Sequence, residues 1–356
     1  MHRTLIWLAA LSIVASAAAL PADELEARID RLEQHHENLQ HRLDQLAKAV
    51  DDVLWHERLG DVAVVDKVRI YGPPKWKEKR PNAIGAGNAV KFYCYVFTPK
   101  DHAGQSRLPL LVLPHGGVHS DFTTYYAHIV RELVAQGYIV VGPEYRGSTG
   151  YGKAHYEKID YGGREVGDCL AARDWAVENH PLVDANRVGI IGWSHGGLIA
   201  LMSLFDHPDS YACAFAGVPV SDLVMRMGVW GPEYQAYYDA DHHIGERPQD
   251  NLEEYKRRSP VWNVDKLRKP LRIHTNPRDE DVTFIEVEHL IQALESADKE
   301  FEYEVYEVPG GHSFDRLDTS EAWAARRDVY RFLARYLKPP KPDVKLGISA
   351  EGRAAP

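Results

Sequence analysis

The segment Gly192-Trp193-Ser194-His195-Gly196-Gly197 constrains the fold more than any other stretch of the chain. The apolar run 187–191 before it predicts a buried strand, and the apolar run 198–205 after it predicts a helix. A Gly-x-Ser-x-Gly segment in this context predicts a sharp turn that strains the serine backbone and lifts its hydroxyl clear of the sheet. Side chains at 192 and 196 would collide across such a turn, and glycine avoids the collision. We therefore expect Ser194 to be a nucleophile.

Strand-like and helix-like segments alternate on both sides of this turn. Alternation of this kind predicts a mostly parallel sheet with helices on both faces and a site at the carboxyl ends of the strands. The expected strands are 62–70, 89–97, 108–113, 138–141, 187–191, 211–216, 270–275 and 301–308, and the expected helices are 125–136, 165–179, 198–205, 283–296 and 321–337. Residues 184–187 are expected to form a turn that leads into the nucleophile strand.

An acid and a histidine follow the last two strands. Asp279, Glu280 and Asp281 come after 270–275, and His312 comes after 301–308. The order serine, acid, histidine is that of α/β-hydrolases, so we expect the α/β-hydrolase fold. His312 would take the proton of Ser194 during attack on a carbonyl, and the acid would fix the histidine tautomer.

Backbone N–H groups are expected to stabilise the charge that develops on the carbonyl oxygen. His195 supplies one, and Gly116 or Gly117, in the Pro114-His115-Gly116-Gly117 segment after strand 108–113, supplies another. This chemistry requires neither a metal nor an organic cofactor.

Several further motifs carry a family resemblance. They are His115-Gly116-Gly117, the run from Tyr145 to Gly152, Gly163 to Asp168, Asp184 with Arg187, Gly192 to Gly197, Ser259-Pro260, Asp279-x-x-Val282 and Gly311-His312-Ser313-Phe314. On these motifs, residues 71–337 resemble the catalytic domain of the prolyl oligopeptidase family of serine peptidases, and most of all its acylaminoacyl-peptidase and dipeptidyl-peptidase-like members. The resemblance implies that Ser194 is the nucleophile, Asp279 the acid and His312 the base, with cleavage of peptide or related acyl bonds.

One departure from the family leaves the substrate open. Family peptidases usually carry a large β-propeller before the catalytic domain, whereas the segment before it here is a heptad helix too small for one. We expect a serine peptidase, with a carboxylesterase on the same scaffold as the alternative. A catalytically silent binding module is a second alternative, which the intact set Ser194, Asp279 and His312 argues against.

Two regions are candidates for substrate binding. Tyr145 and Arg146 lie in a Gly-rich loop expected near the site, and Trp230 and Tyr234 lie in an aperiodic insertion, 219–264. The aromatic side chains of the insertion could form an apolar substrate wall or the insertion's own small core. Asp241-His242-His243 shows no third metal ligand in the sequence, so we expect a solvated loop there.

The amino-terminal residues predict export. Arg3, an apolar core and small residues at 15–19 are typical of a signal peptide over residues 1–19, and an uncleaved membrane anchor is the alternative. The expected location is secreted or periplasmic. Cys94, Cys169 and Cys213 could form at most one bridge.

Residues 23–58 predict a separate helix with a heptad seam. Its members are Leu25, Ile29, Leu32, His36, Leu39, Leu43, Leu46, Val50 and Val53. The narrow seam favours self-association into a homo-oligomer, and folding back onto the catalytic domain is the alternative. The catalytic domain is expected over 60–338, followed by a polar tail, 339–356. A net charge of −10 argues against a nucleic-acid surface.

Overall fold

A single eight-stranded sheet organises the computed structural model, which describes residues 21–78, 80–102 and 104–342. The spatial order is β1-β2-β4-β3-β5-β6-β7-β8, and β1, β2 and β4 pair antiparallel while all the remaining neighbours pair parallel. The strands are β1 (Ala63–Pro74), β2 (Ala89–Pro99), β3 (Leu108–Val112), β4 (Ile139–Glu144), β5 (Val183–Trp193), β6 (Cys213–Gly217), β7 (Leu271–Thr275) and β8 (Glu302–Val305). The predicted mostly parallel α/β sheet is confirmed.

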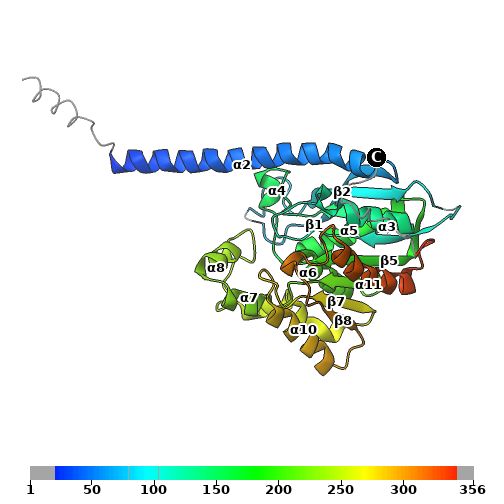
Figure 1. The fold of residues 1–356 in the computed structure, drawn as a ribbon. Helices are drawn as coiled ribbons and strands as arrows, with labels where there is room; N and C mark the ends of the chain where they lie inside the picture. The colour runs from blue at the N-terminus through cyan, green and yellow to red at the C-terminus, as the bar shows by residue number, and fades with distance from the viewer. Residues whose placement is uncertain (1–20, 79, 103, 343–356) are drawn as a thin grey trace, which may run out of the picture.

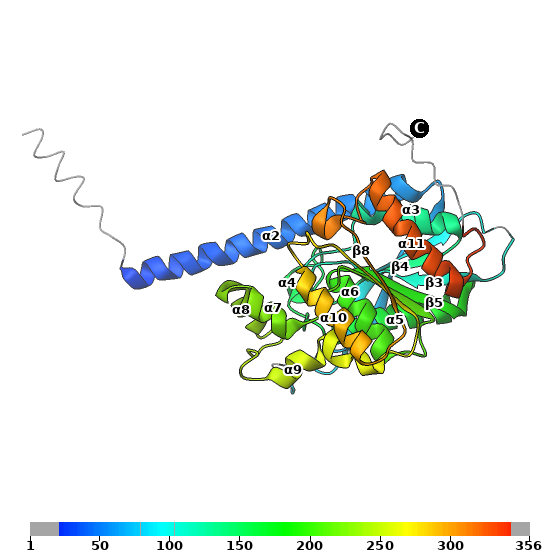
Figure 2. The same ribbon diagram turned by 60° about the horizontal axis from the view of Figure 1, so that its bottom comes forward.

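Helices cover both faces of this sheet (Figures 1 and 2). One apolar core packs α5, α6 and α10 on one face, and a second packs α3, α11 and the end of α2 on the other. The helices are α2 (Ala22–Leu59), α3 (Ala127–Gln136), α4 (Lys153–Tyr156), α5 (Arg164–Asn179), α6 (His195–Asp206), α7 (Leu223–Val229), α8 (Pro232–Asp239), α9 (Leu252–Arg257), α10 (Phe284–Ser296) and α11 (Ser320–Leu337), with short 3-10 turns at Thr124–Tyr126, Pro260–Lys266 and Gly311–Ser313.

Strand side chains alternate between the two cores because successive residues of a strand point to opposite faces. In β5, Val188 and Ile190 enter the first core, and Ile191 and Trp193 enter the second. Both faces are therefore apolar, which explains the nearly continuous apolar runs of the central strands.

Two sequence expectations differ in part from the structure. Residues 184–187 fall within the bounds of β5 but outside its pairing with β3, which passes from Leu108–Val183 directly to Leu110–Val188. They form a turn-like bulge, in which Asp184 accepts the Asn186 backbone N–H at 3.0 Å and Arg187 Nε at 2.7 Å. The aperiodic insertion, 219–264, contains short helices, α7 to α9, whose lengths are too small for a clear helical period.

Helix α2 contacts the domain mainly through its carboxyl-terminal half, with Glu37 also reaching Lys153, and the first turns of the helix extend beyond the body (Figures 1 and 2). Trp55 is fully buried and stacks on Phe122 with ring centroids 5.4 Å apart, and Leu59 is buried beside it. The apolar seam residues lie on another face and are all exposed, from 47% for Ile29 to 69% for Val53. The helix therefore does fold onto the catalytic domain, but it does so without covering its heptad seam.

The three cysteines are buried free thiols, so the single bridge that their number allowed does not form. Within the described ranges, no helix is both long and apolar enough to cross a bilayer. The signal peptide expected over residues 1–19 lies outside those ranges.

Candidate active site

Ser194 occupies the turn between β5 and α6, with backbone angles φ 59° and ψ −124°. This conformation is strained for a residue with a side chain. A Cβ on Gly192 would lie 2.2 Å from the Gly196 carbonyl oxygen, and a Cβ on Gly196 would lie 2.5 Å from the carbonyl oxygen of Pro114. The two glycines therefore make the turn possible, as their spacing predicted.

Asp279 and His312 meet at the same edge of the sheet, after β7 and β8. His312 Nδ1 lies 2.7 Å from Asp279 Oδ2, while Asp279 Oδ1 accepts the backbone N–H groups of Asp281 and Val282 at 2.9 and 2.8 Å. Asp279 is buried, whereas Glu280 and Asp281 are exposed. Of the three neighbouring acids, only Asp279 therefore pairs with the imidazole.

The loop after β3 brings the predicted oxyanion glycines beside Ser194. A Cβ built on Gly116 would lie 3.4 Å from the Ser194 Cβ. The Gly116 N–H is already used, because it donates to the Tyr126 hydroxyl at 3.0 Å. Gly116 is thus corrected from a donor to a neighbour of the site. The remaining candidates are the Gly117 N–H and the N–H of His195, which begins α6 and so has no partner within the helix.

Two of the predicted substrate-binding residues are instead structural. Tyr145 is fully buried, its ring stacks on His115 at 4.1 Å, and its hydroxyl donates to the carbonyl oxygens of His115 and Gly117 at 3.0 Å. It therefore supports the oxyanion loop from behind. Arg146 is also fully buried and forms a two-pronged pair with Asp168 at 2.8 Å. Neither side chain is accessible to a substrate.

Trp230 and Tyr234 are half-buried in the insertion and stack on each other with centroids 5.7 Å apart. Both lie against the guanidinium of Arg226, at 5.9 and 5.6 Å. Arg226 in turn pairs with Glu286 at 3.1 Å. These contacts favour a small core within the insertion, and a role in substrate binding stays a prediction.

A buried contact that the sequence reasoning missed joins the nucleophile strand to the histidine loop. The Trp193 indole N–H, one residue before Ser194, donates to Asp315 Oδ2 at 2.9 Å, three residues after His312. Burial alone would raise the pKa of Asp315, but the adjacent His274, with Nδ1 at 3.7 Å, brings it below its usual value. The x position of the Gly-x-Ser motif gave no sign of this role.

Helix α2 reaches the loops behind the site through Lys48. Its Nζ contacts Glu144, lies 3.0 Å from Asp121 and donates to the Phe122 carbonyl oxygen at 2.6 Å. Burial alone would lower the pKa of Lys48, but the two carboxylates raise it above its usual value. Burial raises the pKa of Glu144 to about 7, against the opposing effect of Lys48. No apolar pattern marks such a lysine as buried.

The elbow follows β5, the buried acid follows β7 and the histidine follows β8, in the chain order that the motifs predicted, and the acid and the histidine are hydrogen-bonded. The family model that matches is the prolyl oligopeptidase family, over residues 124–340. The chain belongs to the prolyl oligopeptidase family. Its fold is the α/β-hydrolase fold shared with that family's solved structures.

Known members are related only distantly in sequence. The chain is 28% identical over 244 residues to the acylamino-acid-releasing enzyme of Arabidopsis thaliana, covering 67% of this chain and 31% of that one. It is 26% identical over 262 residues to dipeptidyl aminopeptidase BIII of Pseudoxanthomonas mexicana, covering 71% and 37%. The match thus spans about a third of the length of these relatives.

Solved structures agree on the fold. Acylaminoacyl peptidase of Pyrococcus horikoshii superposes with a TM-score of 0.63 at 18% identity, covering 78% of this chain and 42% of that one. A puromycin-hydrolysing peptidase of Mycobacterium tuberculosis gives 0.62 at 23% identity, covering 78% and 40%.

Proposed function

We propose that this protein hydrolyses peptide or acyl-aminoacyl bonds through an acyl-enzyme on Ser194. The observation that carries the proposal is the 2.7 Å hydrogen bond between His312 and Asp279, at the sheet edge where the strained Ser194 lies. A buried carboxylate on Nδ1 of the imidazole leaves Nε2 as the proton acceptor. Family membership supports the same chemistry.

The proposed reaction has two halves. His312 Nε2 takes the Ser194 hydroxyl proton as the oxygen attacks the substrate carbonyl, and the N–H groups of Gly117 and His195 stabilise the oxyanion. His312 then gives the proton to the leaving amine as the bond to it breaks. A water molecule, deprotonated by His312, attacks the acyl-enzyme and releases the acid and Ser194.

The relatives' names support an amide substrate. One is named for releasing acylated amino acids and another as a dipeptidyl aminopeptidase. A carboxylesterase is the alternative, because an ester needs less precise protonation of its leaving group than an amide.

Labelling with a fluorophosphonate probe tests the nucleophile. The protein should be labelled, and Ser194→Ala should remove both labelling and turnover while the folded spectrum is retained. Persistent turnover of an activated ester by Ser194→Ala would refute the assignment. A matched ester and anilide with one acyl group then separate the two substrate classes. Ester turnover with no measurable cleavage of anilides or short peptides would favour the carboxylesterase.

We also propose that the protein is exported, on the basis of residues 1–19 alone. Expression of the full chain in a bacterial host, followed by mass spectrometry of the secreted or periplasmic fraction, should find a chain that begins near residue 20. An intact chain confined to the membrane fraction would support the uncleaved anchor.

The exposed seam of α2 supports a homo-oligomer, with a second copy of this chain as the partner. Its apolar members all point away from the docked face, and only a second helix would cover so narrow a seam. Leu32→Glu with Leu39→Glu should lower the mass measured by light scattering. Gln34→Glu, an exposed change off the seam, should leave that mass unchanged. If the wild type, the double variant and Gln34→Glu all had the same mass, the seam would not be an interface.

A further inference from the structure

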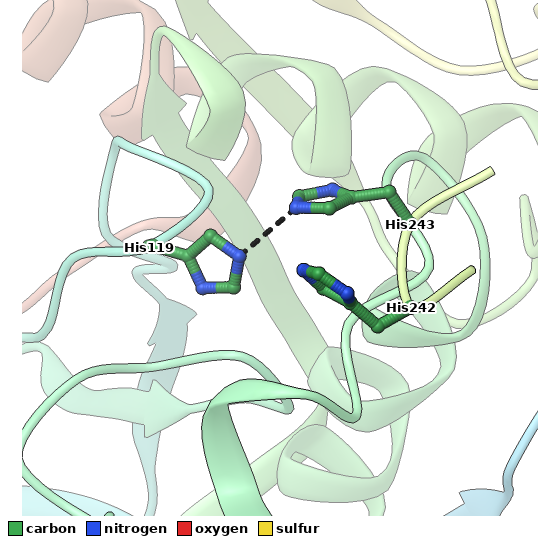
Figure 3. A group of neighbouring side chains, drawn as sticks. All are labelled: His119, His242 and His243. Atoms are coloured by element: carbon green, nitrogen blue, oxygen red, sulfur yellow. Dashed lines mark hydrogen bonds between the residues drawn. The ribbon is translucent and has the colours of Figure 1, made fainter. Parts of the chain in front are cut away.

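Three histidines from distant parts of the chain meet outside the triad (Figure 3). His119 lies in the loop between β3 and α3, and His242 and His243 lie between α8 and α9. One ring nitrogen from each lies within 4.8 Å of the others, and His119 Nε2 is 3.0 Å from His243 Nε2. The expectation of a solvated loop at 241–243 is wrong, because His243 is 1% exposed and His119 supplies the third imidazole.

The hydrogen bonds of His119 fix the tautomer that a metal ligand needs. Its Nδ1 lies 2.8 Å from the Gly147 carbonyl oxygen, which can only accept, so Nδ1 carries the proton. In the neutral ring the lone pair is then on Nε2, which points at His243 (Figure 3). A carbonyl that orients the far nitrogen of a histidine is the usual outer support of a metal ligand. His243 Nδ1 is buried and has no hydrogen-bond partner among the described residues.

The surroundings keep these rings neutral and fixed. Burial, together with the neighbouring imidazoles, lowers the pKa of His119 to about 4 and that of His243 to about 2. Because His119 Nε2 can only accept, His243 Nε2 donates the 3.0 Å hydrogen bond between them. A bound metal ion would replace that proton, and the neutral His243 would then carry its proton on Nδ1. The Tyr156 ring stacks on His119, and the Tyr237 ring meets it edge-on at 5.9 Å, so the imidazole is held between aromatic neighbours.

The geometry suits a small tetrahedral ion. Zn–N distances of about 2.0–2.1 Å place ligating nitrogens about 3.3–3.4 Å apart, so the 3.0 Å pair needs little movement. The other separations, which are at most 4.8 Å, close through a small shift of the half-exposed His242. Three imidazoles leave a fourth position for water. His242 and His243 also line a cavity of about 420 Å³, which gives an ion a way in.

We propose that His119, His242 and His243 bind one Zn²⁺ ion. The ion would join two segments that are otherwise separate in the chain, the loop that carries Gly116 and Gly117 and the 219–264 insertion. His119 is two residues after Gly117, so an occupied site fixes the oxyanion loop to the insertion. None of the three histidines belongs to the triad, so zinc binding can be measured whether or not the proposed peptidase chemistry holds.

Zinc binding to tag-free protein tests this proposal, because a polyhistidine tag would itself bind the ion. After treatment with a chelator, Zn²⁺ is titrated in competition with a chromogenic indicator. We expect one ion per chain and a rise in melting temperature, because the ion binds the folded state. Co²⁺ in its place should give the visible absorption of a tetrahedral site.

Variants then locate the ion. Loss of an outer support alone weakens metal sites 10–100-fold, so His119→Gln or His242→Gln should weaken binding by at least about 100-fold. Both side chains are only half-buried, which favours correct folding. Circular dichroism and urea unfolding check that folding. His35→Gln, an exposed histidine on α2, should bind zinc as the wild type does.

Either of two results overturns the proposal. One is wild-type protein that takes up no stoichiometric zinc or gives only octahedral Co²⁺ spectra. The other is undiminished binding by the double variant His119→Gln/His242→Gln. The wild-type measurements decide the matter even where a variant misfolds.

Discussion

The catalytic edge of the sheet and the docked half of helix α2 both depend on buried charge, but they arrange it differently. At the sheet edge, Asp279 is buried while its partner His312 remains partly exposed, with 16% of its side-chain surface accessible. At α2, Lys48 and Glu144 are both buried. A pair with one accessible member can exchange a proton with a substrate, whereas a fully enclosed pair can only stabilise the fold. Substitutions in the two pairs should therefore affect different quantities.

The largest expected effect is on rate. Asp279→Asn should lower kcat by about 10,000-fold, because the amide favours the wrong histidine tautomer. The midpoint of urea unfolding should move little, since the side chain keeps its shape. Asp281→Asn is the matched control and should retain nearly full activity, because the Asp281 side chain is exposed. An equal loss of kcat in Asp279→Asn and Asp281→Asn would contradict the assignment of Asp279 as the acid.

The next effect is on stability. Lys48→Met should lower the free energy of unfolding by about 3–5 kcal/mol, because Glu144 and Asp121 lose the cation between them. Lys153→Met, which removes a half-exposed lysine, is the control. Labelling of Ser194 in the protein that remains folded should persist. If Lys48→Met lowered activity but left the free energy of unfolding unchanged, the Lys48–Glu144 pair would not be a purely structural one.

The same variant has a pH signature. Glu144 already has a pKa raised to about 7 by burial, and removal of Lys48 raises it further. A carboxyl whose folded pKa exceeds its unfolded value stabilises the fold below the unfolded pKa, and that stability is lost as pH rises through the folded value. The deficit of Lys48→Met in urea unfolding should therefore be smaller at pH 5 than at pH 8.

These two regions also show what sequence can predict. The elbow was predictable in detail because sterics allow few residues at 192 and 196, and the order of Ser194, the acid and His312 restricts the topology. Choosing Asp279 among its neighbours needed either the family resemblance or the observed hydrogen bond. The docked face of α2 was not predictable, because its contacts include the polar Lys48, which an apolar period does not mark.

Loop contacts were the least predictable features. Tyr145 and Arg146 stood in a Gly-rich segment typical of binding loops, yet their partners, His115 and Asp168, turn both inward. A metal site at His242 and His243 was dismissed from the sequence because no third ligand was apparent there. His119 is more than 120 positions from His243 in the chain, so only the fold shows that they meet.

A smaller effect is expected at the hydrogen bond that joins the nucleophile strand to the histidine loop. Trp193→Phe removes the hydrogen bond to Asp315 and leaves that buried carboxylate with one partner fewer, which should cost about 1.5–3 kcal/mol of stability. Activity should fall as well, through kcat rather than KM, since the loop positions His312. Trp323→Phe is the control, because its buried indole N–H has no partner among the described residues. Equal changes in stability and kcat in Trp193→Phe and Trp323→Phe would show that the Trp193–Asp315 hydrogen bond does not position His312.

The smallest expected effect belongs to a half-exposed pair between α2 and α4. Glu37 lies 2.5 Å from Lys153 Nζ, but both side chains are more than 40% accessible. Water and salt screen such a pair, and ordering two long side chains offsets much of the attraction, so Glu37→Gln should cost at most about 1 kcal/mol. The effect should shrink further at high salt, whereas that of Lys48→Met should persist because its partners are buried. Unfolding by urea at low and high salt measures both. If Glu37→Gln destabilised the protein as much as Lys48→Met does, burial would not be what separates a structural pair from an incidental one.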